Sequence, residues 1–593
     1  MPRHITSPAR LICLLLAGLA AGRAGAAIKV EVEGIDGDLR RNVTTLLSVE
    51  RYRERERIAP DAVERLFRRV EPEVREALRP FGYYEPEVDA TLEAIDKDQN
   101  WRVRIRITPG PPVLVDQVNV TVDGPGNDDP VFTQITSNLP LKSGDRLQHP
   151  LYEQIKRGLQ AAAATYGYLD ARLTRSELQV DAEAHRASIY LSIETGERYR
   201  FGATTIKQNV IRDDELRRFL RYQEGEPYDA NAWLRTQFAL DDSQYFSNVS
   251  VLPDERDTAT HIVPMQISAD PAHRTFPIAA GYGTDTGVRG TVSWYNPRVN
   301  SLGHRLQMRL QASEQEQTFN TLYTIPFRDP ARERITLNLT ASDERVSSSV
   351  RTSTVSLTPG ITQVLGRWQR ALSVAAAHTT TRDTVNGRQT VDLIVPGITY
   401  ASVPEGYLGE DLLTRAMYIE LLGSHTALGA KSNFLRIDIQ SERQLDIRPL
   451  WHLLMRGQLG STAIRSDGAI PGQYRFFAGG DRSVRGFGFD ELSPVTLSST
   501  GQQQRIGGRH LITGTLEVQR DISHGIALAT FVDFGNALNR FQDPLAWSTG
   551  LGIRWLLPGI TLGLDVAQAV RAPGYDKLPG PRLHVNISPR SVK

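Results

Sequence analysis

The sequence predicts a chain in two parts: α+β repeats, followed by an all-β transmembrane barrel of about sixteen antiparallel strands. Three observations support this prediction. The chain begins with a segment typical of exported proteins, helical patterns recur up to about residue 270, and runs of alternating polarity fill the remainder. At 593 residues the chain is too long for one compact core, so several domains are expected.

The first residues have the pattern of a cleavable export signal. Arg3 and Arg10 precede a short apolar run at 11–22, and small residues follow at 24–26. The apolar run is far shorter than the ~20 residues that a membrane-spanning helix needs, which argues against the alternative of a membrane anchor. We therefore predict a signal peptide over residues 1–26 and a location in a bacterial envelope.

Composition excludes several classes of function. The single cysteine, Cys13, lies inside the signal, and the alternative of a lipoprotein acceptor is weak because almost no apolar run precedes it. The mature chain then has no disulfide, thiol nucleophile or cysteine metal site. A net charge of +1, from 69 basic and 68 acidic residues, gives no indication of a nucleic-acid partner. With 23% charged residues and no further long apolar segment, any membrane span must be made of strands.

The first half of the chain repeats one pattern. Helical periodicity at 62–78 is followed by an aromatic turn that contains Gly82. A second helical stretch at 151–166 is followed by a similar turn at Gly167, and Tyr245-Phe246-Ser247 is a looser third copy. The period is roughly 80 residues and each unit reads β-α-α-β-β, which the alternative of three unrelated turns does not explain. We place the repeats at 27–111, 112–198 and 199–271.

Gly82 and Gly167 stand between aromatic residues, at points where a helix turns sharply into a strand. Glycine tolerates the positive φ of such a turn, and the aromatic side chains can pack over a small core. Modules of this size have exposed sheet edges. Such edges suit the addition of an extended chain as an extra strand.

From residue 272 to 593 the helical periodicity disappears. Runs of roughly eight to twelve residues alternate in polarity, as at 333–340, where Ile335, Leu337 and Leu339 share one face. About sixteen such segments follow one another, an even number as bacterial barrels require. A soluble sandwich or propeller is the alternative, and the export signal and the lack of cysteine favour the membrane. An aromatic content of 7% is modest for the girdles of such barrels.

One long insertion, at about 466–508, interrupts the strands. It contains Val484, Arg485, Gly486 and Phe487, with further glycines and aromatic residues beside them. This run closely resembles the lid-loop motif of the BamA/TamA superfamily of outer-membrane assembly factors, and we call the insertion the lid loop. Glycines permit close turns and aromatics pack on an inner wall, which suits a loop folded into a barrel lumen. An arginine held there needs a carboxylate partner, because an unpaired buried charge is costly.

Two carboxylates are candidate partners for the lid arginine. Glu517 lies in the next strand and Asp533 in the strand after it. Both segments resemble the superfamily's strand motifs, whose acidic residues meet the arginine. The alternative for Arg485 is an exposed loop cation, and the glycine-rich context with two acidic strand motifs in the right order favours the buried role.

The resemblance covers nearly the whole mature chain. It implies three polypeptide-transport-associated (POTRA) domains in the periplasm and a sixteen-stranded barrel in the outer membrane. Three repeats match the TamA members, whereas BamA members generally have five and two-partner secretion transporters two. One departure is the last strand, 582–588, which lacks the terminal aromatic residue common in outer-membrane proteins. The sequence therefore does not fix the residue at which this strand ends, or how firmly it pairs with the first strand.

The resemblance also implies a function: an assembly factor that helps to insert or translocate β-barrel and autotransporter proteins. Its partners would be unfolded outer-membrane clients, outer-membrane lipid and an inner-membrane-anchored TamB-like protein. The first strand, near 275–284, and the last would pair weakly and open sideways. The alternatives are a phospholipid conduit and a two-partner secretion pore; the pore predicts a plug helix before the first repeat, for which residues 27–28 leave no room. A passive porin does not explain the repeats.

No pattern of an enzyme is found. The sequence lacks a Gly-Lys-Ser phosphate loop, a His-Glu-x-x-His helix and a Gly-x-Ser-x-Gly elbow. Its 12 histidines are scattered, without acidic neighbours at metal-ligand spacing. We therefore expect no catalytic residue, no cofactor and no metal ion.

Overall fold

The computed structural model describes most of the chain, in twelve segments. These are 28–52, 58–95, 100–283, 287–345, 350–383, 387–403, 417–430, 432–464, 472–497, 503–523, 525–557 and 560–589. The predicted signal peptide at 1–26 lies outside them. The chain divides into two compact units, and the boundary between them runs through the third repeat. The first unit comprises Met1–Gly202, Glu224–Asn231 and Glu255–Val263, and the second Ala203–Gln223, Ala232–Asp254 and Pro264–Lys593.

The first repeat is a three-stranded sheet packed against helices. In the order β1-β3-β2, β1 runs parallel and β2 antiparallel to the central strand β3, and Val103, Ile105 and Ile107 of β3 are buried. The elements are β1 (Ile28–Glu33), α2 (Gly37–Leu46), α3 (Ser48–Arg51), α4 (Pro60–Phe67), α5 (Val70–Leu78), a 3-10 turn (Arg79–Phe81), β2 (Glu87–Ala94) and β3 (Trp101–Thr108).

The prediction of one helix over 62–78 was wrong. Two helices, α4 and α5, occupy this stretch, and α2 and α3 precede them. Pro72 explains the break, because its ring would clash with the carbonyl of Arg68 in a continuous helix. Proline is tolerated in a first helical turn, and Pro72 is the third residue of α5.

The second and third repeats keep the same sheet topology, in the orders β4-β6-β5 and β7-β9-β8. Each has two main helices, as the sequence predicts. The second repeat contains β4 (Leu114–Asp123), a 3-10 turn (Pro125–Asp128), α6 (Pro130–Ser137), α7 (His149–Thr165), β5 (Arg172–Asp181) and β6 (Arg186–Glu194). The third contains β7 (Arg200–Lys207), α8 (Asp213–Arg217), α9 (Ala230–Asp241), β8 (Phe246–Pro253) and β9 (Ile262–Pro271).

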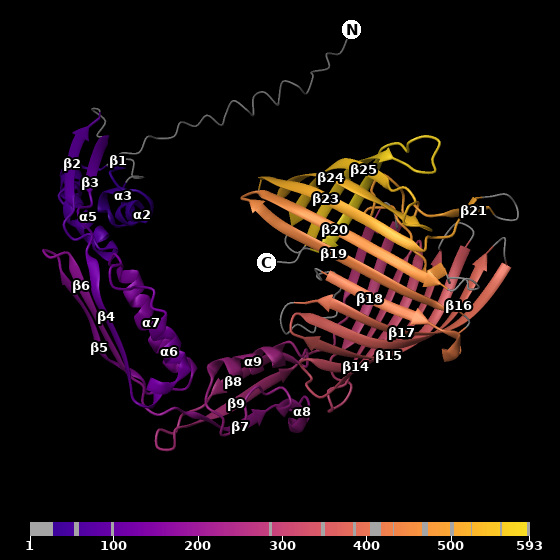
Figure 1. Cartoon of the computed structure of the whole chain (residues 1–593), viewed down its shortest axis with the longest axis horizontal. Helices are drawn as coiled ribbons and strands as arrows, with labels where there is room; N and C mark the ends of the chain where they lie inside the picture. Colours follow the sequence, from indigo (N-terminus) through magenta and orange to yellow (C-terminus); the bar gives the residue numbers. More distant parts are fainter. Residues whose placement is uncertain are drawn as a thin grey trace, which may run out of the picture. The chain divides into compact units, whose positions relative to one another are not determined.

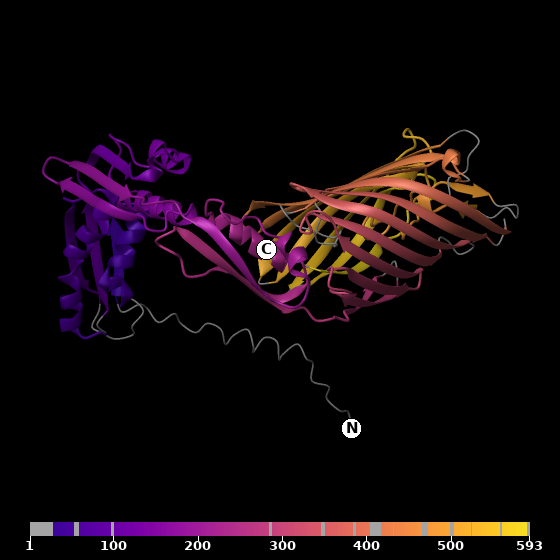
Figure 2. The ribbon, with the colours of Figure 1, turned by 90° about the horizontal axis from the view of Figure 1, so that it is seen from below.

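Beyond the repeats, sixteen strands form one sheet, and Figures 1 and 2 show it wrapped into a barrel. Neighbours in the sheet follow chain order and pair antiparallel. The strands are β10 (Ile278–Gly283), β11 (Gly287–Asn296), β12 (Arg305–Ser313), β13 (Glu316–Pro326), β14 (Glu333–Arg345), β15 (Val350–Leu365), β16 (Trp368–Asp383), β17 (Gly387–Ser402), β18 (Met417–Ser424), β19 (Phe434–Arg448), β20 (Trp451–Ile464), β23 (His510–Ser523), β24 (Ile526–Leu538), β25 (Ala546–Leu557), β26 (Ile560–Arg571) and β27 (Arg582–Pro589).

The barrel strands alternate between an exposed apolar face and a polar face turned inward. On β24, Leu528 and Val532 are exposed, whereas Ala529, Phe531 and Asp533 are buried. This alternation is the pattern of a barrel whose outer face meets lipid. The predicted fold class of α+β repeats followed by a sixteen-stranded antiparallel barrel is confirmed.

None of the helices in the described segments is long and apolar enough to cross a membrane.

Gly82 lies in the joint between the first and second repeats. Its φ is +83°, and its carbonyl accepts a hydrogen bond from the Val113 amide at 2.8 Å. A Cβ on Gly82 would lie 2.5 Å from the Leu147 carbonyl oxygen. Beside it, the Tyr84 hydroxyl and His149 Nε2 lie 2.7 Å apart. Burial raises the pKa of Tyr84 and lowers the pKa of His149, so this contact joins two neutral groups at neutral pH.

Gly167 makes the same joint between the second and third repeats. Its φ is +90°, and its carbonyl accepts from the Tyr199 amide at 2.8 Å. A Cβ there would lie 2.9 Å from the Tyr228 carbonyl oxygen. In both joints, glycine allows the turn after the last helix of a repeat to touch the backbone of the next repeat.

The third copy of this turn has a glutamine in place of glycine. Gln244 has a φ of +62°, so it, and not the predicted Tyr245-Phe246-Ser247, is the counterpart of Gly82 and Gly167. The Gln244 side chain accepts a hydrogen bond from the Tyr295 hydroxyl of β11 at 2.7 Å.

Further contacts inside the second unit join the third repeat to the barrel turns. The Tyr245 hydroxyl donates to the Gly303 carbonyl at 2.6 Å, and Arg221 binds Asp329 with two hydrogen bonds of 2.8 and 2.9 Å. The part of the third repeat that belongs to this unit is therefore held on the barrel by both neutral and charged contacts.

A glycine substitution tests the first joint. Gly82→Ala should weaken it by roughly 2–3 kcal/mol, because the new methyl group adds a backbone clash to the strain of a positive φ. Gly144→Ala is the matched control, since Gly144 has a φ of +88° but nothing within 4 Å of its Cβ position, and should cost about 1 kcal/mol. Hydrogen exchange of the peptides around residues 82 and 147 measures both. Equal exchange in the two variants would contradict the close-approach explanation.

Candidate functional site

The lid loop leaves the barrel wall between two paired neighbours. β20 and β23 pair from Trp451↔Arg520 to Ser461↔His510, so the wall is continuous while the loop makes an excursion from it. The described parts of the loop contain a 3-10 turn at Gly472–Tyr474 and the short strands β21 (Val495–Leu497) and β22 (Gln503–Arg505). Residues 466–471 and 498–502 of the predicted loop lie outside the described segments.

The predicted motif lies in a small apolar core inside the barrel. Val484 and Phe487 are fully buried, against Leu511 of β23, Ala537 of β24 and Ala569 of β26. A tight turn links the two motif residues, because the Phe487 amide donates to the Val484 carbonyl at 3.1 Å. The loop is thus packed against inward-facing residues of the wall.

Arg485 is 3% exposed and meets both predicted carboxylates. Its Nε and Nη2 donate to the two oxygens of Asp533 at 2.9 and 2.8 Å, and its Nη1 donates to Glu517 Oε2 at 2.8 Å. The guanidinium also lies over the Phe531 ring, with Cζ 3.2 Å from the ring centre. Planar, two-pronged pairing of this kind is specific to arginine.

Two further charged residues complete the cluster. Asp565 of β26 accepts from Arg485 Nη1 at 3.2 Å, and Arg554 of β25 donates to Glu517 at 2.8 Å and to Asp565 at 2.5 Å. Two arginines and three carboxylates on four adjacent strands and the loop therefore form one buried network. The sequence analysis missed Arg554 and Asp565. The sequence marks each of them only as a charged residue at an inward-facing position of an alternating strand. Many barrel strands carry such a residue, so the pattern did not single these two out.

Glycines make room for this network. A Cβ on Gly486 would lie 2.7 Å from Ser548 Cβ and 2.8 Å from the Ala569 amide nitrogen, so the loop backbone touches the wall directly. A Cβ on Gly552 of β25 would lie 1.9 Å from Asp565 Oδ1. The Arg485 amide also donates to Asp533, at 3.1 Å, so backbone and side chain hold the same carboxylate.

A second set of contacts holds the start of the loop against other strands. Gln473 accepts from Thr354 of β15 at 3.2 Å and from Thr379 of β16 at 2.9 Å. The Phe476 ring lies 4.4 Å from Arg436 Cζ, and the Tyr474 ring packs on Phe434 at 4.7 Å between centres. The loop therefore contacts the wall at separate places, from β15 to β26.

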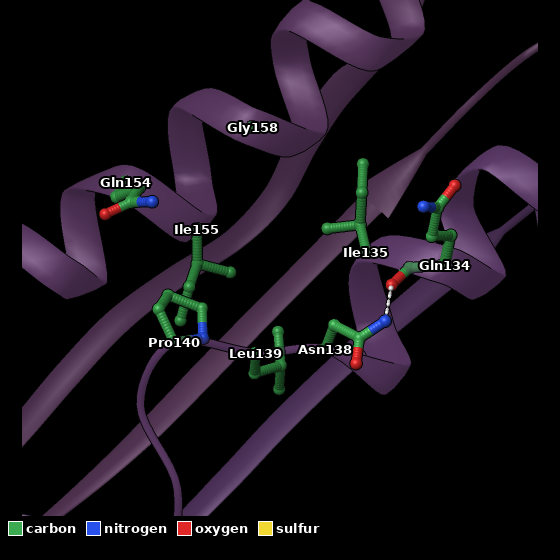
Figure 3. A pocket seen from close by; sticks show the side chains of 8 residues that line it. All are labelled: Gln134, Ile135, Asn138, Leu139, Pro140, Gln154, Ile155 and Gly158. Carbon is green, nitrogen blue, oxygen red and sulfur yellow. Dashed lines mark hydrogen bonds between the residues drawn. The ribbon is translucent and has the colours of Figure 1, made fainter.

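One surface pocket lies in the second repeat, between α6 and α7 (Figure 3). Its volume is about 330 Å³, with Ile135, Leu139 and Ile155 as apolar lining and Gln134 and Gln154 as amides. None of the eight lining residues is charged. The pocket therefore offers shape and amide hydrogen bonds, without an acid or a base. Within the described residues, no group of three or more His, Cys, Asp or Glu side chains is placed to hold a metal ion.

Sixteen antiparallel strands, a loop held inside them by a buried arginine, and three preceding α+β repeats define a class: outer-membrane barrels with N-terminal POTRA domains. Comparison with known families agrees. Residues 413–590 match the Omp85 superfamily domain, residues 29–109 match the POTRA domain TamA domain 1, and residues 199–266 match the surface antigen variable number repeat, a POTRA family. The chain belongs to the Omp85 superfamily, which includes BamA and TamA.

One relative is similar in sequence, and one solved structure has a similar fold. The outer membrane protein assembly factor BamA of Nitratidesulfovibrio vulgaris is 22% identical over 445 residues, covering 67% of this chain and 52% of the relative. The chain thus spans about half the length of that protein. The crystal structure of BamA from Haemophilus ducreyi lacking POTRA domains 1–3 is 15% identical, with a TM-score of 0.64 over 80% of this chain and 100% of the other.

The location follows from the class. The barrel lies in the outer membrane and the POTRA domains lie in the periplasm. The matched POTRA ranges fall inside the predicted repeats at 27–111 and 199–271, and the boundaries themselves stay a prediction.

Substitution of the lid arginine tests the buried network. Arg485→Ala should destabilise the barrel by about 3–5 kcal/mol, because it leaves three buried carboxylates with one arginine. Arg482→Ala, three residues away, should change stability by no more than about 0.5 kcal/mol, since Arg482 is 66% exposed and its Glu442 contact is 3.9 Å long. The urea midpoint of the detergent-folded barrel measures both. Similar midpoints for the two variants would count against the network as a structural anchor.

Proposed function

We propose that this protein is an outer-membrane assembly factor that helps to insert or translocate β-barrel and autotransporter proteins. The observation that carries the proposal is the seam, the line along which β10 and β27 lie next to each other. In the described residues the hydrogen-bonded order starts at β10 and ends at β27, and no ladder joins the two. Every other neighbouring pair in this sheet is joined by a ladder.

The strands at the seam are also short. β10 has six residues and β27 has eight, whereas β15, β16 and β17 have 16 each. A strand that crosses a membrane needs about 9–11 residues. The two strands at the seam are therefore among the shortest of the barrel, and no ladder joins them in the described residues, so we propose that the wall separates there.

An unpaired edge is a template for another strand. Backbone amides and carbonyls exposed at the seam are costly in lipid, and an incoming client strand would satisfy them. The client would exchange hydrogen bonds with water for ladder bonds before it enters the hydrocarbon. In this mechanism the barrel supplies an edge between two short strands, and the chemistry is strand pairing alone.

The POTRA domains supply further edges. In the described residues β2, β5 and β8 each end a three-stranded sheet and pair on one side only. Such edges accept an extended segment by main-chain hydrogen bonding. We propose that they receive clients, and that the domains also bind an inner-membrane-anchored TamB-like partner. The match of the first repeat to the POTRA domain TamA domain 1 supports this choice of partner.

A covalent lock on the seam tests the assembly function. A cysteine pair, one on β10 and one on β27 with Cα atoms within about 7 Å, should block client assembly when oxidised and restore it when reduced. The chain without the predicted signal contains no native cysteine, so no other thiol can form a disulfide with the introduced pair. The readout is surface display of an autotransporter client. Full activity after complete crosslinking would show that client assembly does not require the seam to open. Loss of phospholipid transport with normal client assembly would favour the alternative of a lipid conduit.

The partner is tested by co-purification. A periplasmic protein with a membrane anchor should copurify with the intact chain and be lost from a variant that lacks residues 28–111. A matched variant with Phe238→Ser, an exposed side chain on α9, controls for loss through altered solubility. Retention of the protein by the truncated chain would move the binding site away from the first repeat.

A further inference from the structure

The last strand has an unusual set of neighbours. β27 forms a ladder with β26, from Arg582↔Ala567 to Pro589↔Ile560, and within the described residues no ladder joins its other side. Half of the main-chain pairing that fixes an ordinary barrel strand is therefore absent there. Contacts with the lid loop take its place.

Glu491 of the lid loop makes the first of these contacts. Its Oε2 accepts from Arg582 Nη2 of β27 at 2.8 Å, and its Oε1 accepts from the Tyr575 hydroxyl at 2.9 Å. The Gly488 amide donates to the same carboxylate at 2.5 Å. Tyr575 belongs to the connection between β26 and β27, so one carboxylate binds the last strand and the segment that leads into it.

His584 makes the second contact, two residues further along β27. Its Nε2 lies 2.6 Å from the Arg485 carbonyl oxygen, and the side chain is 2% exposed. Residues two apart on a strand share a face, so Arg582 and His584 both point inward. The lid loop thus holds two successive inward positions of the last strand.

Glycine allows the loop to come this close. A Cβ on Gly488 would lie 2.9 Å from Arg582 Nη1 and 2.9 Å from Glu491 Oε2. The Glu491 amide donates back to the Gly488 carbonyl at 3.1 Å, which closes a tight turn around the ion pair. Backbone, carboxylate and guanidinium therefore meet at one point.

We propose that Glu491 is a positioning residue that fixes the last strand at the seam, through Arg582 and Tyr575. Arg485 and Glu491 then have different roles in the lid loop. The Arg485 network holds the loop on β23 to β26, and Glu491 connects the held loop to β27. Arg582 is 39% exposed and Arg485 only 4%, so the second connection is closer to solvent than the first. The importance of this connection for activity rests on the proposed function of the seam.

Hydrogen exchange on the full-length folded protein tests the proposal. Glu491→Gln removes the charge of the carboxylate and keeps its shape. It should raise the exchange rate of the peptide over 582–589 about tenfold, and leave the peptides of β24 and β25 unchanged. Glu442→Gln is the matched control, because Glu442 is also a carboxylate that contacts the lid loop, through Arg482, and it binds Arg456. Neither of these two contacts involves β27. This control should not alter the exchange of 582–589.

A second variant keeps the test decisive. Arg582→Gln breaks the pair from the other side, and the double variant should show the same exchange as Glu491→Gln alone, because Glu491→Gln already removes the ion pair that Arg582→Gln breaks. Additive effects, unchanged exchange in both single variants, or faster exchange across the whole barrel would each overturn the proposal. If Glu491→Gln does not fold, the exchange rate of the peptide over 582–589 is measured on Arg582→Gln alone.

The two proposals fail in different ways. Exchange of 582–589 is measured on the purified protein without a client, so it reports the connection and not the activity. A loosened last strand combined with an inert seam lock would reject the assembly function and keep the role of Glu491. An unaltered last strand combined with an active seam lock would do the reverse.

Discussion

The buried charge of Arg485 determines which residues must line the interior of the barrel beside it. A guanidinium removed from water is stable only among carboxylates, and here these come from β23, β24 and β26, with Arg554 of β25 between them. Four neighbouring strands must therefore keep one register. A slip by one residue would turn a charged side chain of the network outward into lipid, which ties the position of the loop to the pairing of the wall.

Close backbone approach is the second constraint, and it recurs in both parts of the chain. Gly486 brings the lid loop onto the wall, and Gly82 and Gly167 bring each repeat onto the next. In all three places a side chain would meet main-chain atoms that cannot move without breaking hydrogen bonds. The third joint is the exception, because Gln244 takes a positive φ and uses its amide to bind Tyr295. The contacts at these joints are thus made by backbone atoms first and by side chains second.

The membrane imposes the third constraint. A barrel avoids unpaired edges in lipid by closing its sheet, yet in the described residues β10 and β27 have no ladder between them. The lid loop compensates from inside, with Glu491 on Arg582 and the Arg485 carbonyl on His584. The loop that the Arg485 network holds in the barrel therefore also contacts the last strand.

Local patterns determined much of this protein. Alternation and helical periodicity separated the repeats from the barrel, and the glycine-rich motif around Arg485 with acidic strands after it indicated the pairing that the structure places at 2.8 Å. These features are written in adjacent residues, so they can be read without knowing the fold. Arg554, Asp565 and Glu491 could not be assigned in this way, because an isolated charge on an alternating strand or in a loop has no partner until strand order and register bring one to it. The positive φ of Gln244 was equally hidden, since residues other than glycine rarely adopt it. Tertiary structure alone decided the partners of Arg554, Asp565 and Glu491 and which strand the lid loop holds, because those contacts join residues between 11 and 99 positions apart in the chain.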